Sequence, residues 1–181
     1  IKNMLETAIK NIDYVITSNR KSRKESMIIK ILYKIHLILT FIFSFKWISF
    51  GNFTTFNSQN IDKILSNGNS WLAHSSAVIK NCKIKRLYAK REKRYFDKSK
   101  LSLINLIEHS LRINAVFSER VKITSLFYII ILYLNFSFTF LSLLIIMNLI
   151  IFNILIIFIK YRHSLNEFKH SSNLIKSHES V

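Results

Sequence analysis

The longest uncharged stretch of the sequence runs from Ile123 to Ile159 and constrains the fold more than any other feature. It covers 37 residues, and Lys122 and Lys160 stand immediately outside it. A membrane-spanning helix needs about 20 apolar residues, so the stretch is nearly two spans long. Its Ser, Thr and Asn side chains can bond to a helix backbone or to a neighbouring helix. We therefore predict a transmembrane helical hairpin over 123–159, with a buried helical pair in a large assembly as the alternative.

The chain is strongly basic although half of its residues are hydrophobic. Lys and Arg number 27 against 10 Asp and Glu, which gives a formal net charge of +17. This excess predicts an anionic partner, namely rRNA, an acidic protein or anionic lipid. Because Cys82 is the single cysteine, neither an intrachain disulfide nor a cysteine-based metal site is expected.

Proline is absent and glycine occurs twice, whereas Ile, Asn, Lys and Phe are abundant. Proline and glycine use GC-rich codons, and the abundant residues use AT-rich ones. Across its whole length the composition resembles that of proteins encoded by AT-rich protist mitochondrial genomes of the ciliate type. The resemblance involves no family motif, and it implies a mitochondrial, organelle-encoded protein.

The first fifty residues contain two apolar segments separated by a polar linker. Residues 1–16 have the periodicity of an amphipathic helix. Glu6, Asp13 and Glu25 are atypical of a transit peptide, so we expect this region to belong to the mature protein. The segment 27–50 could span a membrane, lie at its interface or be a core helix. We expect its His36 to be a core residue rather than a haem or metal ligand.

Residues 51–122 form the basic part of the chain. Ten Lys and Arg residues lie within 80–100, against Glu92 and Asp97. Read as a helix, this segment carries four cations on one stripe that could contact an anionic partner or lipid, with Tyr and Phe interleaved for stacking on bases. The stripe consists of Lys83, Arg86, Lys90 and Arg94. A short helix over 71–79 and an amphipathic helix over 101–117 are also predicted.

Charge also predicts how the protein is oriented in a membrane. A hairpin over 123–159 returns the polar tail, 160–181, to the side of the basic segment, which satisfies the positive-inside rule if that side is the mitochondrial matrix. A span over 27–50 would place the basic N-terminus on the opposite side, so two spans are preferred. Four residues are expected to anchor the hairpin ends at the interface: Lys122, Lys160, Tyr161 and Arg162.

No pattern of catalytic residues is visible. Two glycines cannot build a glycine-rich phosphate loop, and no nucleophile–base set or carboxylate pair follows from the spacing. The stretch 123–159 has no Asp, Glu, Lys or Arg for a proton path and no histidine for haem. We expect no enzymatic activity, no cofactor and no metal.

The predicted fold is all-α: amphipathic and basic helices over 1–50 and 51–122, the transmembrane hairpin over 123–159, and the tail over 160–181. The first functional hypothesis is a structural accessory subunit of a mitochondrial inner-membrane complex, either of the respiratory chain or ATP synthase. Its partners would be other subunits of that complex and an anionic lipid such as cardiolipin.

The alternative is a mitochondrial ribosomal protein that binds rRNA through residues 80–122. The span Arg86–Val116, in which basic and aromatic residues precede LINLIEHSL, faintly resembles small-subunit ribosomal proteins. Against this hypothesis stands the uncharged stretch, which has no evident purpose on rRNA. A small membrane-active toxin or holin is disfavoured, because the 120 residues before the hairpin would be unnecessary.

Overall fold

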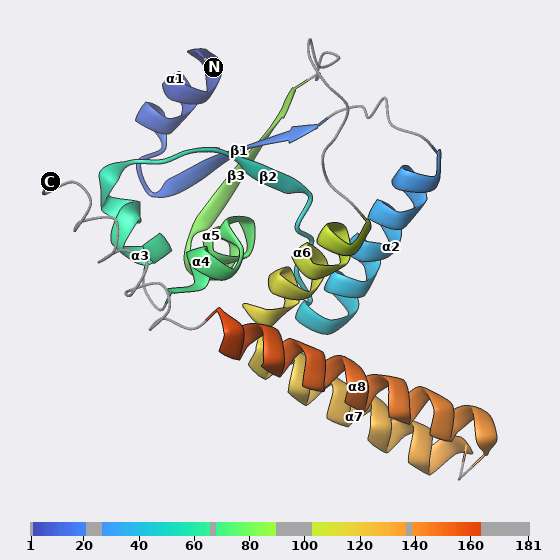
Figure 1. Ribbon diagram of the computed structural model, residues 1–181. Coiled ribbons are helices and arrows are strands. Elements are labelled where there is room, and N and C mark those ends of the chain that lie inside the picture. The colour runs from blue at the N-terminus through green and yellow to red at the C-terminus, as the bar shows by residue number, and fades with distance from the viewer. Residues whose placement is uncertain (1, 21–26, 66–67, 90–102, 137–138, 164–181) are drawn as a thin grey trace, which may run out of the picture.

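The computed structural model describes residues 2–20, 27–65, 68–89, 103–136 and 139–163. Figure 1 shows two regions: an α/β body, and a pair of long helices, α7 and α8, that projects from it. The body contains α1 (Lys2–Lys10), β1 (Tyr14–Arg20), α2 (Met27–Ser44), β2 (Phe50–Thr55), η1 (Ser58–Asn60), α3 (Ile61–Leu65), α4 (Asn69–Leu72), α5 (His74–Asn81), β3 (Lys83–Ala89) and α6 (Leu103–Ala115). The helical pair consists of α7 (Ser118–Phe136) and α8 (Phe140–Arg162).

A three-stranded sheet lies at the centre of the body, with the order β2-β1-β3. β1 pairs antiparallel with β2, with a register shift between Thr17 and Asn19. On its other side β1 pairs parallel with β3, from Tyr14 opposite Lys83 to Arg20 opposite Ala89. A parallel pair needs a long crossover connection, and the chain between β1 and β3 supplies it with α2, β2 and the short helices α3 to α5.

The prediction of an all-α fold is therefore wrong, although the described chain is mostly helical. The amphipathic helix expected over 1–16 ends at Lys10, and the β-branched residues Val15, Ile16 and Thr17 enter the central strand. Both faces of β1 are buried, so this strand lacks the alternation of polar and apolar residues that marks a half-exposed strand. The basic helix expected from Lys80 onward is instead the strand β3 over Lys83–Ala89.

Helices cover both faces of the sheet. On one face, Ile16 packs with Met4 and Ala8 of α1, and Leu87 of β3 joins this small cluster. On the other face, Val15 belongs to the main core, which includes buried residues of β2 and of α3 to α5. The two clusters explain why α1 and α5 lie on opposite sides of the strands in Figure 1.

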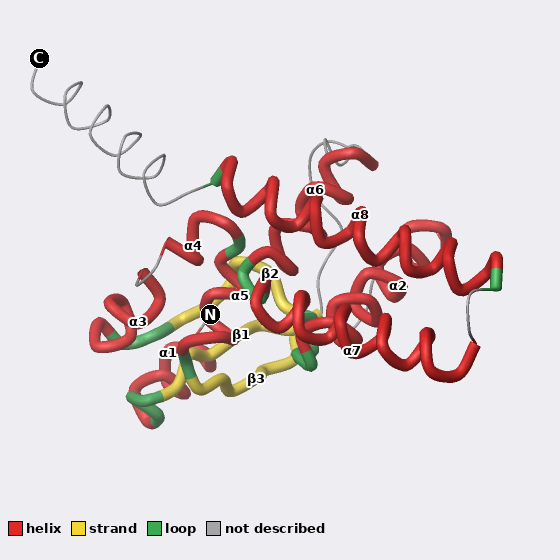
Figure 2. Tube along the Cα trace, turned by 90° about the horizontal axis from the view of Figure 1, so that it is seen from below, coloured by secondary structure: helices red, strands yellow, loops and turns green. Residues whose placement is uncertain are grey.

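The main core extends from the sheet to the near end of the helical pair. Val121 of α7 and Ile156 and Ile159 of α8 are buried in it. Beyond this point most apolar side chains of the pair are exposed, for example Leu134 at 73% and Phe140 at 83%. Figures 1 and 2 show α7 and α8 side by side, running away from the sheet.

Only one of the two predicted membrane spans is supported. Among the described helices, α8 alone is long and apolar enough to cross a membrane, and 17% of its most apolar window is buried within the protein. α7 carries Glu119, Arg120 and Lys122 in its first five residues, which leaves too short an apolar length. The prediction of a two-span transmembrane hairpin is thus replaced by one candidate span in an antiparallel helical pair.

The hydrophobic segment 27–50, whose placement the sequence left open, is the helix α2 followed by the start of β2. It is not a candidate span. One face of α2 packs on α6 and α7, with Leu37 and Phe43 buried. Its other face is exposed, including Met27 and Ile28.

Candidate functional site

The basic strand β3 forms one edge of the sheet. In the described sheet it pairs with β1 on one side only, so its other side presents unpaired backbone groups. Three cations and one aromatic residue of this strand are exposed: Lys83, Lys85, Arg86 and Tyr88. Tyr88 is 68% exposed. We call these four residues the basic edge.

The cations of the basic edge bond to neutral groups rather than to carboxylates. The Lys85 ammonium donates to Oδ1 of Asn11 at 3.2 Å, and Nη2 of Arg86 donates to the backbone carbonyl of Trp47 at 2.7 Å. In the described ranges, the ion pairs that form involve Glu119 and Glu108, and none includes a cation of β3. No carboxylate of the described residues therefore pairs with the positive charge of this edge.

Because β3 is a strand, the predicted contact residues do not lie on one helical stripe. Side chains alternate across a strand, so Lys83 and Lys85 lie on the face of Leu87 and α1, whereas Arg86 and Tyr88 lie on the face of Ile84. Lys83 and Arg86 are exposed as expected, but they do not share a helical stripe. The other two predicted contacts, Lys90 and Arg94, lie outside the described residues.

Lys85 and Tyr88 were missing from the predicted contact set. The segment KIKRLYA alternates basic and apolar residues at its start, which is a strand signal. The run of like charges around it favoured a helical interpretation instead. A period-two test of this segment could have placed Lys83 and Lys85 together.

A second group of charges lies where the helical pair meets the body. The ammonium groups of Lys122 and Lys160 both approach Oε1 of Glu119, at 3.3 and 3.5 Å. The hydrogen bond from Lys122, with the charges of both lysines, lowers the pKa of the Glu119 carboxyl. Two of the predicted anchor residues are thus brought together on an acid that the sequence argument had not singled out.

The other two predicted anchors, Tyr161 and Arg162, lie at the same end of α8. Both are exposed, Tyr161 at 81%. The spacing of Glu119 and Lys122 was visible in the sequence as an i,i+3 pair. The contribution of Lys160 was not visible, because it depends on the antiparallel packing of α7 and α8.

Two histidines of the body, His36 and His74, bond to hydroxyl groups. Nδ1 of His36 lies 2.6 Å from Oγ of Ser110, which joins α2 to α6, and Nε2 of His74 lies 3.1 Å from Oγ1 of Thr54, which joins α5 to β2. Burial lowers the pKa of His74. His36 thus lies in a packed interface, and no group of three His, Cys, Asp or Glu side chains in the described ranges could hold a metal ion.

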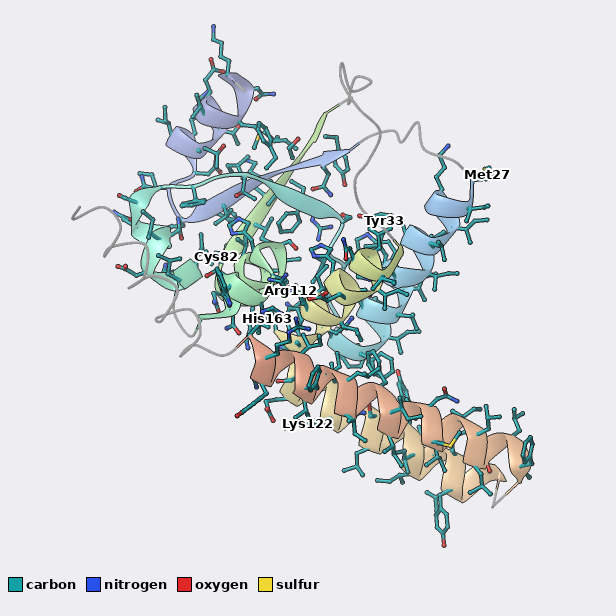
Figure 3. All side chains as sticks on the ribbon, viewed as in Figure 1. Met27, Tyr33, Cys82, Arg112, Lys122 and His163 are labelled. Atoms are coloured by element: carbon teal, nitrogen blue, oxygen red, sulfur yellow. The ribbon has the colours of Figure 1, made fainter. Side chains whose placement is uncertain are left out.

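Cys82 is half-buried at the start of β3, and burial raises the pKa of its thiol. A nucleophilic cysteine needs the opposite shift, toward the thiolate. Arg112 is also structural, because its guanidinium donates to the backbone carbonyls of Leu72 and Trp71 at 2.8 and 2.7 Å. Figure 3 shows Cys82 and Arg112 among the packed elements of the body.

An apolar groove separates α2 from α8. Its lining consists of Leu39, Phe43, Ile145, Asn148, Leu149 and Phe152. Asn148 is the one polar residue of this lining, and its amide donates to the carbonyl of Leu144 at 2.8 Å. The groove therefore offers apolar contact and no titratable group for chemistry.

No protein-family model matches the chain, and searches of curated proteins and of solved structures also found no match. The function must therefore be inferred from the residues and from their arrangement.

Proposed function

We propose that this chain is a non-catalytic RNA-binding constituent of a mitochondrial ribosome and that the basic edge of the sheet contacts rRNA. The observation that carries the proposal is the exposure of Lys83, Lys85, Arg86 and Tyr88 on an edge strand without a carboxylate partner among the described residues. Lys and Arg bind phosphates and release counterions. Tyr88 adds an exposed aromatic face on which an unpaired base can stack.

The direction of β3 favours RNA over a lipid surface as the partner of this edge. In Figure 1, β3 runs away from the helical pair toward the opposite side of the body. The attraction of an anionic membrane fades within a Debye length, about 8–10 Å in physiological salt. If α8 entered a membrane, the far end of β3 would therefore point away from the lipid surface.

Three features of the sequence support the ribosomal and mitochondrial assignments. The net charge of +17 is typical of proteins that neutralise phosphates. The composition resembles that of products of AT-rich mitochondrial genomes, and Arg86–Val116 faintly resembles small-subunit ribosomal proteins.

The test is a salt titration of RNA binding by the full chain, with single-stranded rRNA fragments as the probe. Each phosphate contact on a single strand contributes about 0.7 to the slope of log K against log salt. Replacing Lys83, Lys85 and Arg86 together by Gln should reduce that slope by about 2. A matched variant replaces Lys2, Lys10 and Lys63 by Gln, which removes the same charge from α1 and α3. If both triple variants lose affinity and slope equally, RNA binding is general electrostatics and the assignment to β3 is wrong.

A second function is favoured by a specific observation, the exposed apolar surface of α8. We infer from it a membrane-attached accessory subunit of a mitochondrial inner-membrane complex, either of the respiratory chain or ATP synthase. The body would face the matrix, and other subunits or cardiolipin would be its partners. At 23 residues α8 is about 34 Å long, enough for a hydrocarbon core of about 30 Å.

Alkaline carbonate extraction tests this second function. Ile150 lies near the middle of α8 and is 49% exposed. Ile150→Lys places a charge at mid-membrane, which costs about 3 kcal/mol for insertion, and should move the protein to the soluble fraction. Lys34→Gln on exposed α2 is the control and should leave the distribution unchanged. Equal retention of the Ile150→Lys protein in the membrane fraction would contradict attachment through α8.

A further inference from the structure

Four cations from three helices lie near one exposed acid at the near end of the helical pair. Lys80 comes from α5, Arg120 and Lys122 from α7, and Lys160 from α8. Glu119 is the acid. We call this group the foot of the pair, and Figure 3 marks its position with the labels of Lys122 and the neighbouring His163.

The cations of the foot are held in place mainly by neutral acceptors. The Lys160 ammonium donates to Oγ of Ser118 at 2.7 Å, and that of Lys80 donates to the carbonyl of Val116 at 2.8 Å. Nη1 of Arg120 donates to the carbonyl of Ser44 at 3.3 Å. An ammonium has three donors and a guanidinium has five, so donors remain for an anionic ligand.

The foot carries an excess of three positive charges, and the cations repel one another. Burial is the main cause that lowers the pKa of Lys80, and the charges of Lys160 and Arg120 lower it further. Glu119 opposes this effect only in part. A bound anion would offset the repulsion, and phosphate oxygens suit lysine and arginine donors.

The helical surface beyond the foot is apolar, and the amide groups of its asparagines form hydrogen bonds within their own helix. Its three asparagines, Asn135, Asn148 and Asn153, each donate to the carbonyl four residues earlier at 2.8 Å. Such back-bonding satisfies amide donors within a helix, as in membrane helices. Close to the foot, Ile123 is 70% exposed and Phe158 is 56% exposed.

An apolar phase that covers α8, the one candidate span among the described helices, also meets the exposed face of α7, because the two helices pack side by side. The connection between Phe136 and Phe140 joins the far ends of α7 and α8, whereas their charged residues all lie at the foot. Insertion would therefore bring the foot to the level of the lipid headgroups. An RNA strand offers phosphates to the foot but nothing to cover the exposed apolar faces.

We propose that the foot binds the phosphate of an anionic phospholipid whose acyl chains lie along the exposed faces of α7 and α8. This lipid site lies apart from the basic edge and does not depend on RNA binding. It rests on the membrane attachment inferred above as the second function.

Flotation of the full chain with vesicles tests the site, using phosphatidylcholine alone and phosphatidylcholine with phosphatidylglycerol. The measured quantity is the preference for the anionic vesicles. The double variant Lys122→Gln, Lys160→Gln should reduce this preference by about fivefold per lysine, the factor expected for one charge at a membrane surface. The control Lys2→Gln, Lys10→Gln removes equal charge from α1 and should change it little.

A gain of binding separates a specific site from a folding defect. Glu119→Gln removes the acid that competes with the ligand, so it should raise the anionic preference severalfold. Glu6→Gln on α1, an exposed acid on the opposite side of the sheet, should have a much smaller effect. Equal effects of the two variants would overturn the site.

The same experiment distinguishes the possible failures. If the unaltered chain floats with neither vesicle, the membrane attachment itself is wrong. If it floats with both and neither foot variant changes the preference, attachment stands and the lipid site is wrong. If inorganic phosphate at millimolar concentration abolishes the preference, or if the foot variants weaken RNA binding instead, the foot serves a soluble anion or RNA and the lipid proposal is overturned.

Discussion

The body buries its apolar side chains around a three-stranded sheet, whereas the helical pair leaves most of its own exposed. In the body, polar groups bond across elements, as between Thr54 and His74 or between Arg112 and the carbonyls of α4. In the pair, asparagines bond back to their own helix. The main difference lies in exposure: the body encloses its apolar groups, and the pair leaves an apolar surface uncovered.

The distribution of charge follows the same division. The exposed cations of β3 belong to the body, and Glu119, Lys122 and Lys160 mark the boundary with the pair. Beyond that boundary the described helices carry no charge. The difference teaches that the net charge and the long uncharged stretch, which compete as clues in the sequence, belong to separate surfaces of the molecule.

The largest expected effect is a loss of stability at the point on α8 where its buried part ends and its exposed part begins. Ile156 is 1% exposed and lies in the main core, whereas its neighbour Ile157 is 49% exposed. Ile156→Ala should lower the free energy of unfolding by about 2–5 kcal/mol, and Ile157→Ala by less than about 0.5 kcal/mol. Chemical denaturation in mild detergent measures both. Similar losses for the two variants would mean that the pair is not divided at this point.

A smaller effect contrasts two arginines. Arg112 in the body satisfies two backbone carbonyls, so Arg112→Met should destabilise the fold by about 1–3 kcal/mol. The matched variant Arg162→Met, at the exposed end of α8, should stay within about 0.5 kcal/mol. Chemical denaturation measures the free energy of unfolding of each variant. Equal losses would contradict the structural role of Arg112.

The smallest effect is a pH dependence that belongs to the body. Burial places the pKa of His74 below its ordinary value of 6.5, so the unfolded chain takes up the proton first as the pH falls. The stabilising contribution is present above pH 6.5 and is lost as the pH falls through the lowered pKa of the folded state. His74→Gln should flatten the stability profile in this window. A profile that keeps its shape in the variant would show that another group is responsible.

The sequence predicts helices better than it predicts how distant segments pair. The uncharged stretch correctly located one long apolar helix, α8 (Phe140–Arg162), although not the predicted two-span hairpin. The periodicity over 101–117 found α6 (Leu103–Ala115). The sheet was missed because β1 is buried on both faces and its parallel partner begins at Lys83, opposite Tyr14. Pairing over such a sequence distance leaves no local signal of which strand is the partner of which.

The candidate sites divide in the same way. Exposure of Lys83 and Arg86 followed from their charge, but the edge that they share with Tyr88 followed from the strand. The i,i+3 spacing of Glu119 and Lys122 is local, whereas Lys80 and Lys160 reach the foot only through packing. The sequence therefore indicated which kinds of residue would form the candidate sites, but not which residues would lie next to one another in space.

Photocrosslinking of the full chain to rRNA, with mass-spectrometric mapping of the crosslinked peptides, tests the central claim most directly. Exposed Tyr88 on the basic edge is the expected crosslinking position. The division of the molecule predicts crosslinked peptides from 83–89 and none from 123–159. Crosslinks confined to the helical pair, or RNA binding without any crosslink on β3, would contradict it.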